Sequence, residues 1–594
     1  MRSVKSLLAA LTIVTTAYAL PEVGVDAHFD QAWPVSVMPQ IVLWGFASIR
    51  DGITWANFET SKGVYAIPAY DQAWLNAAHA NGLKVVLLLN GGNRLYSNNY
   101  DPTAYSNAAA ALATQLKNYP AVEAIEILNE PNNDFQSYVG ANWESAYVKL
   151  ANAAYAAIKA ANPSMTVITG GAQGQENWDM LSMGLKGDGY TSHPYSPPLI
   201  IPETVYEPPN ANDSTLAGFV ADWRSRTTRP LWFTEYGCNT EICGGSFEIS
   251  NFSQAMYYDR RLLETLGLGV EHSFIYDFKD EGIPGNCDSY GPYGLWTSNP
   301  DNTLSDPKMS QLTITRILNA LNGLNPMPLG AVSASGAGLD SADFYGYAFG
   351  NSSESVAAVW LGNGYPAYGV PPGTGAAAVL ETASIRFPVP SGIQSVTAVD
   401  PLYATTEIVP TTNWSVTGSN ITVTGVSVGI APTLLVASSS ASVGPTPPPG
   451  PIPPPSPPPT PPTDSIAQWE SQFLSGYKAF SGTKNAVYVD PNYSPYFDAP
   501  SFTGLFFDGT YASGVITPNS NAVSAVVYYT ENHPATSGRI TAAVSFAPST
   551  VTVTNPITGS TTVLPSYDWS FYNGDAVILF NFQISGSPQV IRIE

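Results

Sequence analysis

The feature that most constrains the fold is a regular alternation of apolar runs and helical patterns along the first half of the chain. Lys84–Leu89 is a nearly continuous apolar run, which is typical of a strand buried on both faces. The preceding segment, Tyr70–Asn81, has helical spacing and stops at Gly82, a favourable residue after a helix. We count eight strand candidates before residue 280. Since most are separated by helices and no glycine-rich phosphate loop follows the first, the pattern predicts a (β/α)8 TIM barrel rather than an open sheet.

The predicted elements of the barrel can be given by their ranges. The expected strands are Val23–Phe29, Ile41–Ile49, Lys84–Leu89, Val122–Glu130, Met165–Gly170, Gly189–His193, Pro230–Glu235 and Val270–Asp277. The expected helices are Tyr70–Asn81, Thr103–Tyr119, Trp143–Ala161, Leu216–Arg226, Ser253–Leu266 and Asp306–Leu321.

The whole chain is predicted to be multidomain, with the barrel at 20–324. From 325 to 442 the pattern changes to short alternating runs broken by turn residues, which predicts a β-sandwich. Residues 443–463 form a proline-rich linker that is expected to be extended. Residues 464–594 return to aromatic and β-branched strands, a C-terminal β-rich domain. Its rings, such as Tyr493, Tyr496 and Trp569, could bind carbohydrate or could equally form its core.

The first 19 residues have the pattern of a secretory signal peptide. Arg2 and Lys5 give a basic start, Leu7–Val14 is largely apolar, and Ala17-Tyr18-Ala19 is a small-x-small end. No later stretch is long and apolar enough to span a bilayer, so we expect no membrane insertion and a secreted protein, extracellular or in a cell wall. Glycosylation fits that route, with sequons at Asn212, Asn251, Asn351, Asn413, Asn420 and Asn492.

Charge and cysteine content exclude some classes of function. The net charge of −23 repels nucleic acid, although an acidic excess is also common in secreted proteins. Cys238, Cys243 and Cys287 permit one disulfide with one thiol left over, and we expect Cys238 to brace the loop after Glu235 through one of the other two. Their spacing lacks a fourth ligand or a nearby histidine pair, so we expect no metal and no cofactor.

Two strand ends carry the candidate chemistry. In Ile125–Asn133, IEILNEPNN, an apolar strand delivers Glu130 directly before Pro131, which cannot continue a ladder. Alternation would put Glu126, Leu128 and Glu130 on one face of this strand. Glu235 ends PLWFTE in the same way. By count these are strands four and seven, which face each other across a barrel mouth, and glycosidic cleavage needs such a pair of carboxyl groups.

At these residues the sequence resembles the clan A retaining glycoside hydrolases. The sequence motifs are most similar to those of glycoside hydrolase family 39 and its cellulase-like relatives. They are EILNEPNNDF, then SHPY after strand six and FTEYG at strand seven. The resemblance covers roughly residues 22–325, and Leu128 replaces the aromatic residue common before Asn-Glu. It implies Glu130 as acid/base, protonated in the free enzyme, Glu235 as ionised nucleophile, and Asn129 as partner of the substrate 2-hydroxyl.

Further substrate-binding candidates follow from the same ring of strand ends. Arg50 could keep Glu235 charged or pair with buried Glu126, and both could hold. His193 could bond the nucleophile or a sugar hydroxyl, or could be a core histidine. Tyr195, Tyr276 and Trp296 could supply planes for sugar rings. His28, Asp277 and Glu281 are weaker candidates for a subsite.

The sequence therefore predicts a monomeric retaining β-glycoside hydrolase that binds β-linked polysaccharide or oligosaccharide of a wall polymer. The competing class is a catalytically inactive carbohydrate-binding or cell-wall scaffold protein, which the same domain order would suit. The presence of Asn129 and both carboxylates favours the enzyme, because a binding protein has no need to keep that charged pair together. The sugar, the linkage and the endo or exo mode stay open.

Overall fold

The computed structural model describes residues 21–440 and separate strands between 486 and 594. The gaps within the first range are 173, 197–201, 206–214, 241–250, 282–290, 337–338, 340–342, 363–380 and 403–404. The expected signal peptide, the proline-rich linker, Cys243, Cys287, Tyr493 and Tyr496 lie outside the described residues.

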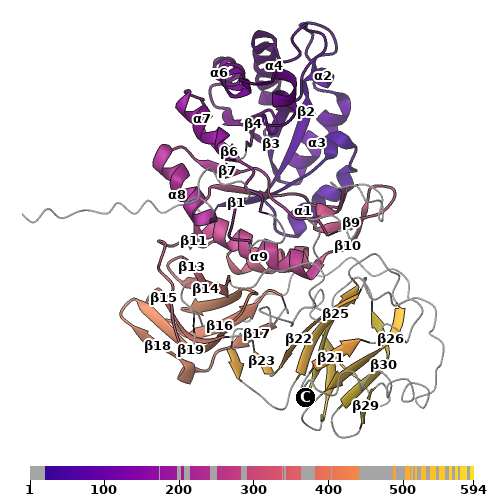
Figure 1. Cartoon of the computed structure of the whole chain (residues 1–594), viewed down its shortest axis with the longest axis vertical. Coiled ribbons are helices and arrows are strands. Elements are labelled where there is room, and N and C mark those ends of the chain that lie inside the picture. The colour runs from indigo at the N-terminus through magenta and orange to yellow at the C-terminus, as the bar shows by residue number, and fades with distance from the viewer. Residues whose placement is uncertain are drawn as a thin grey trace, which may run out of the picture.

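Eight parallel strands form the first sheet, in the order β5-β4-β3-β2-β1-β8-β7-β6. Parallel bridges from Ile168 to Gly189 and from Ala172 to Ser192 join β5 to β6 and close the ring. The predicted TIM barrel is confirmed (Figure 1). Its strands are β1 (Glu22–Asp26), β2 (Ser48–Thr54), β3 (Lys84–Asn90), β4 (Val122–Ile127), β5 (Thr166–Thr169), β6 (Tyr190–Ser192), β7 (Leu231–Phe233) and β8 (His272–Ile275).

Helices cover the outside of the ring (Figure 1). They are α1 (Met38–Leu43), α2 (Trp55–Phe58), α3 (Ala69–Ala80), α4 (Pro102–Gln115), α5 (Asp134–Val139), α6 (Trp143–Ala161), α7 (Glu176–Ser182), α8 (Leu216–Arg226), α9 (Asn251–Gly267) and α10 (Met309–Ala320). A hairpin of β9 (Trp296–Ser298) and β10 (Leu304–Pro307) precedes α10. Within the described chain, no helix combines the length and the apolar character needed to cross a membrane.

Two predicted elements were wrong in part. The expected strand Ile41–Ile49 begins inside α1, whose first turn contains proline, a residue preorganised for a helix start. Gly45, at φ 99°, follows the end of α1, and β2 starts only at Ser48. The helix expected from Asp306 starts at Met309, because a residue before proline favours extended backbone and Asp306 precedes Pro307 in β10.

Large side chains fill the interior of the barrel beneath its C-terminal mouth. Ile168, Trp232 and Phe274, from three different strands, are at most 4% exposed and form one apolar cluster with Val86 and Ala124. Glycines make room for the rings: a Cβ at Gly24 would lie 2.5 Å from Phe274, and one at Gly189 would lie 2.6 Å from Trp232. The barrel is therefore a packed core that supports a site at its mouth.

A β-sandwich follows the barrel. One sheet has the order β11-β13-β14-β20-β16-β17 and the other β12-β15-β19-β18. The sandwich is fixed to the barrel by Tyr347, which donates to Glu264 of α9 at 3.0 Å, and by Trp360, which donates to buried Glu203 at 2.6 Å. The strands are β11 (Asn325–Pro326), β12 (Ser333–Ser335), β13 (Phe344–Gly350), β14 (Glu354–Leu361), β15 (Glu381–Pro388), β16 (Ser395–Asp400), β17 (Thr405–Ile408), β18 (Trp414–Thr417), β19 (Asn420–Val428) and β20 (Thr433–Ser438).

The C-terminal region is also built of antiparallel strands, as predicted. They pair as β21-β26-β30-β29, β22-β25-β31-β27-β28 and β23-β24. Their bounds are β21 (Ala486–Val489), β22 (Phe502–Asp508), β23 (Thr510–Ala512), β24 (Val515–Thr517), β25 (Val523–Tyr529), β26 (Thr536–Ala543), β27 (Val551–Thr554), β28 (Thr561–Val563), β29 (Trp569–Tyr572), β30 (Ala576–Ile584) and β31 (Gln589–Ile593).

Candidate active site

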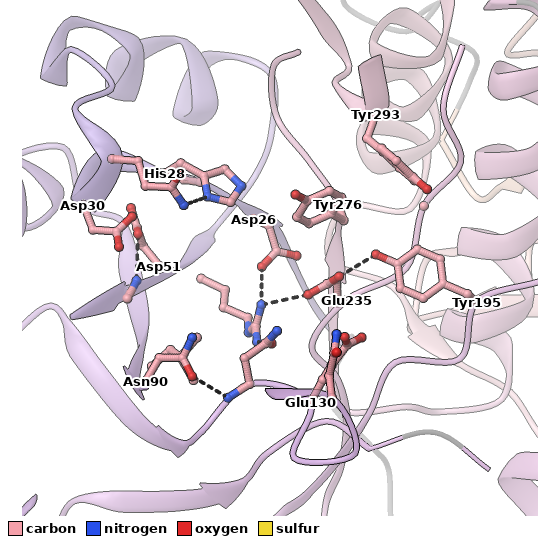
Figure 2. A pocket seen from close by; sticks show the side chains of 18 of the residues that line it. Asp26, His28, Asp30, Asp51, Asn90, Glu130, Tyr195, Glu235, Tyr276 and Tyr293 are labelled. Carbon is pink, nitrogen blue, oxygen red and sulfur yellow. Dashed lines mark hydrogen bonds and ion pairs between the residues drawn. The ribbon is translucent and has the colours of Figure 1, made fainter. Parts of the chain in front are cut away.

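A cavity of about 550 Å³ opens at the C-terminal ends of the barrel strands (Figure 2). Six of the predicted site residues line it, from five different strands or the turns that follow them: Arg50, Asn129, Glu130, Tyr195, Glu235 and Tyr276. His193 is fully buried behind this wall, within contact of both predicted catalytic carboxyl groups. Segments that lie far apart in the sequence thus meet in one site.

The turn after β4 presents Asn129 and Glu130 together. The strand ends at Ile127, and Leu128 and Glu130 have positive φ values of 61° and 37°. The prediction from simple strand alternation was therefore wrong here. It placed Asn129 and Glu130 on opposite faces of the strand, whereas both side chains line the cavity. Such backbone conformations are unfavourable for residues other than glycine and are typical of functional sites. Gly170 packs so closely on the carbonyl of Leu128 that a Cβ there would clash.

Arg50 is the central cation of the site. It donates from Nη1 to Glu235 Oε2 at 3.2 Å and from Nη2 to Asn129 Oδ1 at 2.7 Å. It also donates from Nε to Glu126 Oε2 at 2.6 Å and from Nη1 to Asp26 Oδ1 at 2.9 Å. Burial alone would lower the pKa of Arg50, but the charges of Glu126, Asp26 and Glu235 raise it well above its ordinary value. Both predicted roles of Arg50 therefore hold at once, as a partner of Glu235 and of buried Glu126.

Glu235 receives one donor on each carboxylate oxygen. Tyr195 donates from its hydroxyl to Oε1 at 2.6 Å, while Arg50 bonds Oε2. Burial and the charge of Glu235 raise the pKa of Tyr195 well above its ordinary value, so the phenol keeps the proton that it donates. An ionised carboxylate, which has acceptors only, fits these partners best.

Glu130 and His193 share a proton. Thr234 donates to Glu126 at 3.3 Å, so its hydroxyl oxygen is left to accept from His193 Nε2 at 3.1 Å. With Nε2 carrying hydrogen, one further proton lies between His193 Nδ1 and Glu130 Oε1, which are 2.8 Å apart.

The charges around this pair shift both pKa values. Burial would raise the pKa of Glu130, but the hydrogen bond and charge of His193 outweigh it and the pKa is lowered. Burial would lower the pKa of His193, but the negative charges of Glu235 and Glu130 raise it. His193 therefore competes with Glu130 for the shared proton, and the expectation that Glu130 is protonated in the free enzyme stays a prediction.

The two carboxyl groups lie close together. Oxygen atoms of Glu130 and Glu235 and a ring nitrogen of His193 all lie within 4.8 Å of one another. Retaining glycosidases hold their carboxyl groups about 5 to 5.5 Å apart, whereas inverting enzymes need about 6.5 to 9.5 Å to admit a water. The spacing fits direct attack by one carboxylate.

Histidine and two carboxylates also meet elsewhere among the described residues. His28 contacts Glu281 and lies 3.8 Å from Asp277 at the edge of the cavity. Glu22, Glu123 and His272 form another such group. Groups of this kind could hold a metal ion in principle. The expectation that the enzyme needs none stays a prediction.

The prediction that Trp296 binds substrate was wrong. It is 6% exposed, does not line the cavity, and packs edge-on against Trp44 with ring centres 5.5 Å apart. Cys238 lines the cavity as a free, buried thiol among the described residues. The expected disulfide stays a prediction, because its candidate partners Cys243 and Cys287 lie outside the described residues. Burial raises the pKa of this thiol well above its ordinary value, which makes it unreactive.

Several lining residues were missed by the sequence reasoning. Among them are Asp26, Asp30, Asp51, Asn90 and Tyr293. Asp26 ends β1, so the rule that selected Glu130 and Glu235 could have found it, but the strand was expected to continue to Phe29. Asn90, the last residue of β3, accepts from the backbone of Asn129 at 3.1 Å and holds the turn after β4.

Comparisons with known proteins agree with this geometry. Residues 28–252 match the family model described as Cellulase (glycosyl hydrolase family 5). The barrel and its carboxyl groups define the class of protein: the chain is a glycoside hydrolase. This family match agrees with the predicted resemblance to clan A glycoside hydrolases and indicates a retaining glycosidase. The resemblance to family 39 is seen in the fold.

Two similar solved structures are compared with the chain, and the first supports the shared fold. A family 39 glycoside hydrolase from Bacteroides cellulosilyticus WH2 has a TM-score of 0.52 and 21% identity, over 71% of this chain and 81% of that chain. A GH30 endoxylanase from Clostridium papyrosolvens C71 has a TM-score of 0.46 and 13% identity, over 71% of this chain and 97% of that chain. At these identities the likeness supports the fold alone. No curated protein matches the chain in sequence.

Proposed function

We propose that the protein cleaves β-glycosidic bonds of wall polysaccharides or their oligosaccharides by double displacement, with Glu235 as nucleophile and Glu130 as acid/base. The observation that carries this proposal is the approach of Glu130 and Glu235 at the ends of β4 and β7, with oxygen atoms within 4.8 Å. Their different partners support different roles. Arg50 and Tyr195 hold Glu235 as an acceptor, whereas Glu130 has access to a proton through His193.

In the first step, Glu235 forms a bond to the anomeric carbon while the bond from that carbon to the leaving oxygen breaks. The leaving oxygen takes up the proton that lies between Glu130 and His193 Nδ1. Thr234 fixes the ring of His193 from the other side, so the proton can pass to Glu130 without any movement of the imidazole.

In the second step, water attacks the anomeric carbon and the bond to Glu235 breaks. Glu130, now without its proton, takes one from the water and restores the shared proton with His193. Two inversions at one carbon leave the product with the β configuration of the substrate.

Asn129 is suited to hold the sugar during both steps. Its Oδ1 accepts from Arg50 at 2.7 Å, which turns the amide so that Nδ2 is left to donate to a sugar hydroxyl. Tyr276, at the end of β8, lines the same cavity and offers a ring face to the sugar. These contacts support binding of the 2-hydroxyl by Asn129.

The setting of the enzyme is part of the same proposal. The N-terminal signal pattern supports secretion, and the sequon at Asn351 is exposed in the turn between β13 and β14. The C-terminal β-rich domain would then keep the barrel near an insoluble polysaccharide. A monomer is sufficient for this chemistry, because the described residues of one chain supply both carboxyl groups.

The test is release of reducing sugar from β-glucans, β-xylans and β-mannans, and cleavage of aryl β-glycosides, by the mature protein and by Glu235→Ala. We expect activity that disappears in the variant and a first product with retained β configuration by proton NMR. An inverted first product would contradict the double displacement. Binding of polysaccharide without any hydrolysis would favour the scaffold alternative.

A further inference from the structure

Asp26 occupies an unusual position beside the predicted nucleophile. It is the last residue of β1, is 2% exposed and lines the catalytic cavity. Its Oδ1 accepts from Arg50 Nη1 at 2.9 Å. Its Oδ2 has no hydrogen-bond partner in the described part of the chain. A buried carboxyl oxygen without a partner is rare, since the loss of hydration is then uncompensated.

The same guanidinium nitrogen joins Asp26 to Glu235. Arg50 Nη1 bonds Asp26 Oδ1 and also Glu235 Oε2 at 3.2 Å, so the two carboxyl groups lie side by side (Figure 2). A pyranose ring whose anomeric carbon contacts Glu235 therefore brings another of its hydroxyl groups within reach of Asp26.

Glu126 provides the contrast. It also pairs with Arg50, through Nε at 2.6 Å, but it is fully buried and does not line the cavity. Its second oxygen accepts from Thr234 at 3.3 Å, so both of its oxygens have partners. Both oxygens of Glu126 are paired away from the cavity, whereas Asp26 lines the cavity and has one buried oxygen without a partner among the described residues.

We propose that Asp26 is a specificity-determining residue, which binds through Oδ2 one ring hydroxyl of the sugar whose anomeric carbon lies against Glu235. The inference rests on the proposed function and adds to it a second polar contact besides that of Asn129. The hydroxyl is at C3, C4 or C6, because Asn129 is assigned the 2-hydroxyl.

The electrostatics of the site agree with this role. Burial and the charge of Glu235 raise the pKa of Asp26 to about 7, against the opposing effect of Arg50. His193 and Tyr276 are the other titratable groups that act on it. In either protonation state Oδ2 can bond a hydroxyl, which both donates and accepts.

The test compares Asp26→Asn with Glu126→Gln on the aryl β-glycoside that the wild-type enzyme cleaves fastest and on its 3-, 4- and 6-deoxy analogues. Both variants keep an oxygen for Arg50, but only Asp26→Asn changes a group at the cavity wall. For one analogue we expect the wild-type enzyme to lose about 10- to 100-fold in kcat/KM, as for a hydrogen bond to a charged group. In Asp26→Asn that penalty should shrink by at least about 3-fold, because a neutral amide bonds a hydroxyl more weakly than a charged group does, while Glu126→Gln should keep it.

The outcomes separate the two proposals. If the enzyme cleaves glycosides but Asp26→Asn ranks the deoxy analogues as wild type does, the role of Asp26 is overturned and the proposed function stands. If the wild-type protein cleaves no glycoside, both are overturned. Should Asp26→Asn fail to fold, Asp26→Ser removes the carboxyl group in a smaller volume and is expected to abolish the same discrimination.

Discussion

The carboxyl groups at the two ends of the catalytic cavity have different hydrogen-bond partners. At the catalytic end, Asp26, Glu126 and Glu235 all bond Arg50. At the far end, Asp51 and Asp30 share a hydrogen bond with each other and, among the described residues, have no arginine or lysine partner.

This difference acts on the pKa values. Burial, and next the charge of Asp30, raise the pKa of Asp51 well above its ordinary value. Glu235, in contrast, accepts from Arg50 at 3.2 Å. Arg50 and Asp51 are neighbours on β2, yet the positive charge of Arg50 acts at one end of the cavity and Asp51 lies at the other. A single buried cation can therefore make the two ends electrostatically different.

The largest expected effect comes from removing that cation. Arg50→Met removes the arginine partner that Asp26, Glu126 and Glu235 share, and we expect a loss of about 3–5 kcal/mol in the free energy of unfolding. Activity should fall by at least about 100-fold, since Glu235 loses a donor. Urea unfolding and aryl glycoside kinetics measure both effects. The double variant with Glu126→Gln should regain part of the stability but not the activity. If Arg50→Met alone were as stable as the wild-type protein, the central role of Arg50 would be refuted.

Glu130→Gln tests the proton shared with His193. With a poor leaving group, kcat/KM should fall by about 10²- to 10⁴-fold, because the leaving oxygen then receives no proton. A dinitrophenyl glycoside, whose leaving group needs no proton, should lose far less in its first step. Pre-steady-state kinetics on both substrates measure the difference, and added azide should yield a β-glycosyl azide. Equal losses on the two substrates would assign Glu130 another role.

Asp51→Asn addresses the far end through the pH dependence of stability. The folded pKa of Asp51 is raised, so the native state keeps a proton that the unfolded state releases above about pH 4. Stability therefore falls as the pH rises from about 4 toward the folded pKa, by about 1.4 kcal/mol per pH unit for one proton. In Asp51→Asn this slope should decrease. Urea unfolding at several pH values checks it. Asp301→Asn is a control that leaves the slope above about pH 5 unchanged, because the folded pKa of Asp301 is lowered and acts only at more acidic pH.

The smallest effect is expected for Trp296→Phe. The Trp296 ring packs against Trp44 and Phe278 outside the cavity, so KM should stay within about 2-fold of wild type with some loss of stability. Tyr276→Ala should raise KM, because that ring lines the cavity. Michaelis–Menten kinetics on one aryl glycoside compare the two variants. A large rise in KM for Trp296→Phe would restore it as a substrate-binding residue.

Local sequence patterns were sufficient to predict the barrel and part of the site. Helices such as Trp143–Ala161 and Leu216–Arg226 have the predicted bounds, because apolar periodicity acts over neighbouring residues. Glu130 and Glu235 were found because a carboxylate at a strand end must lie at the mouth of a parallel barrel. The backbone around Glu130 was not found, since positive φ at Leu128 and Glu130 breaks the alternation on which that reading depended.

The sequence by itself determined the order of strands and helices, the class of enzyme and the candidate carboxyl pair, because these depend on short-range spacing and on a motif. Only the tertiary structure decided the partners: Arg50 bonds Glu235 across 185 residues of sequence and Glu126 across 76. It also decided that Trp296 is buried and that Asp26 lines the cavity with one oxygen unpartnered among the described residues. Protonation follows burial and the nearest charge, and both are properties of contacts between distant segments rather than of residue type.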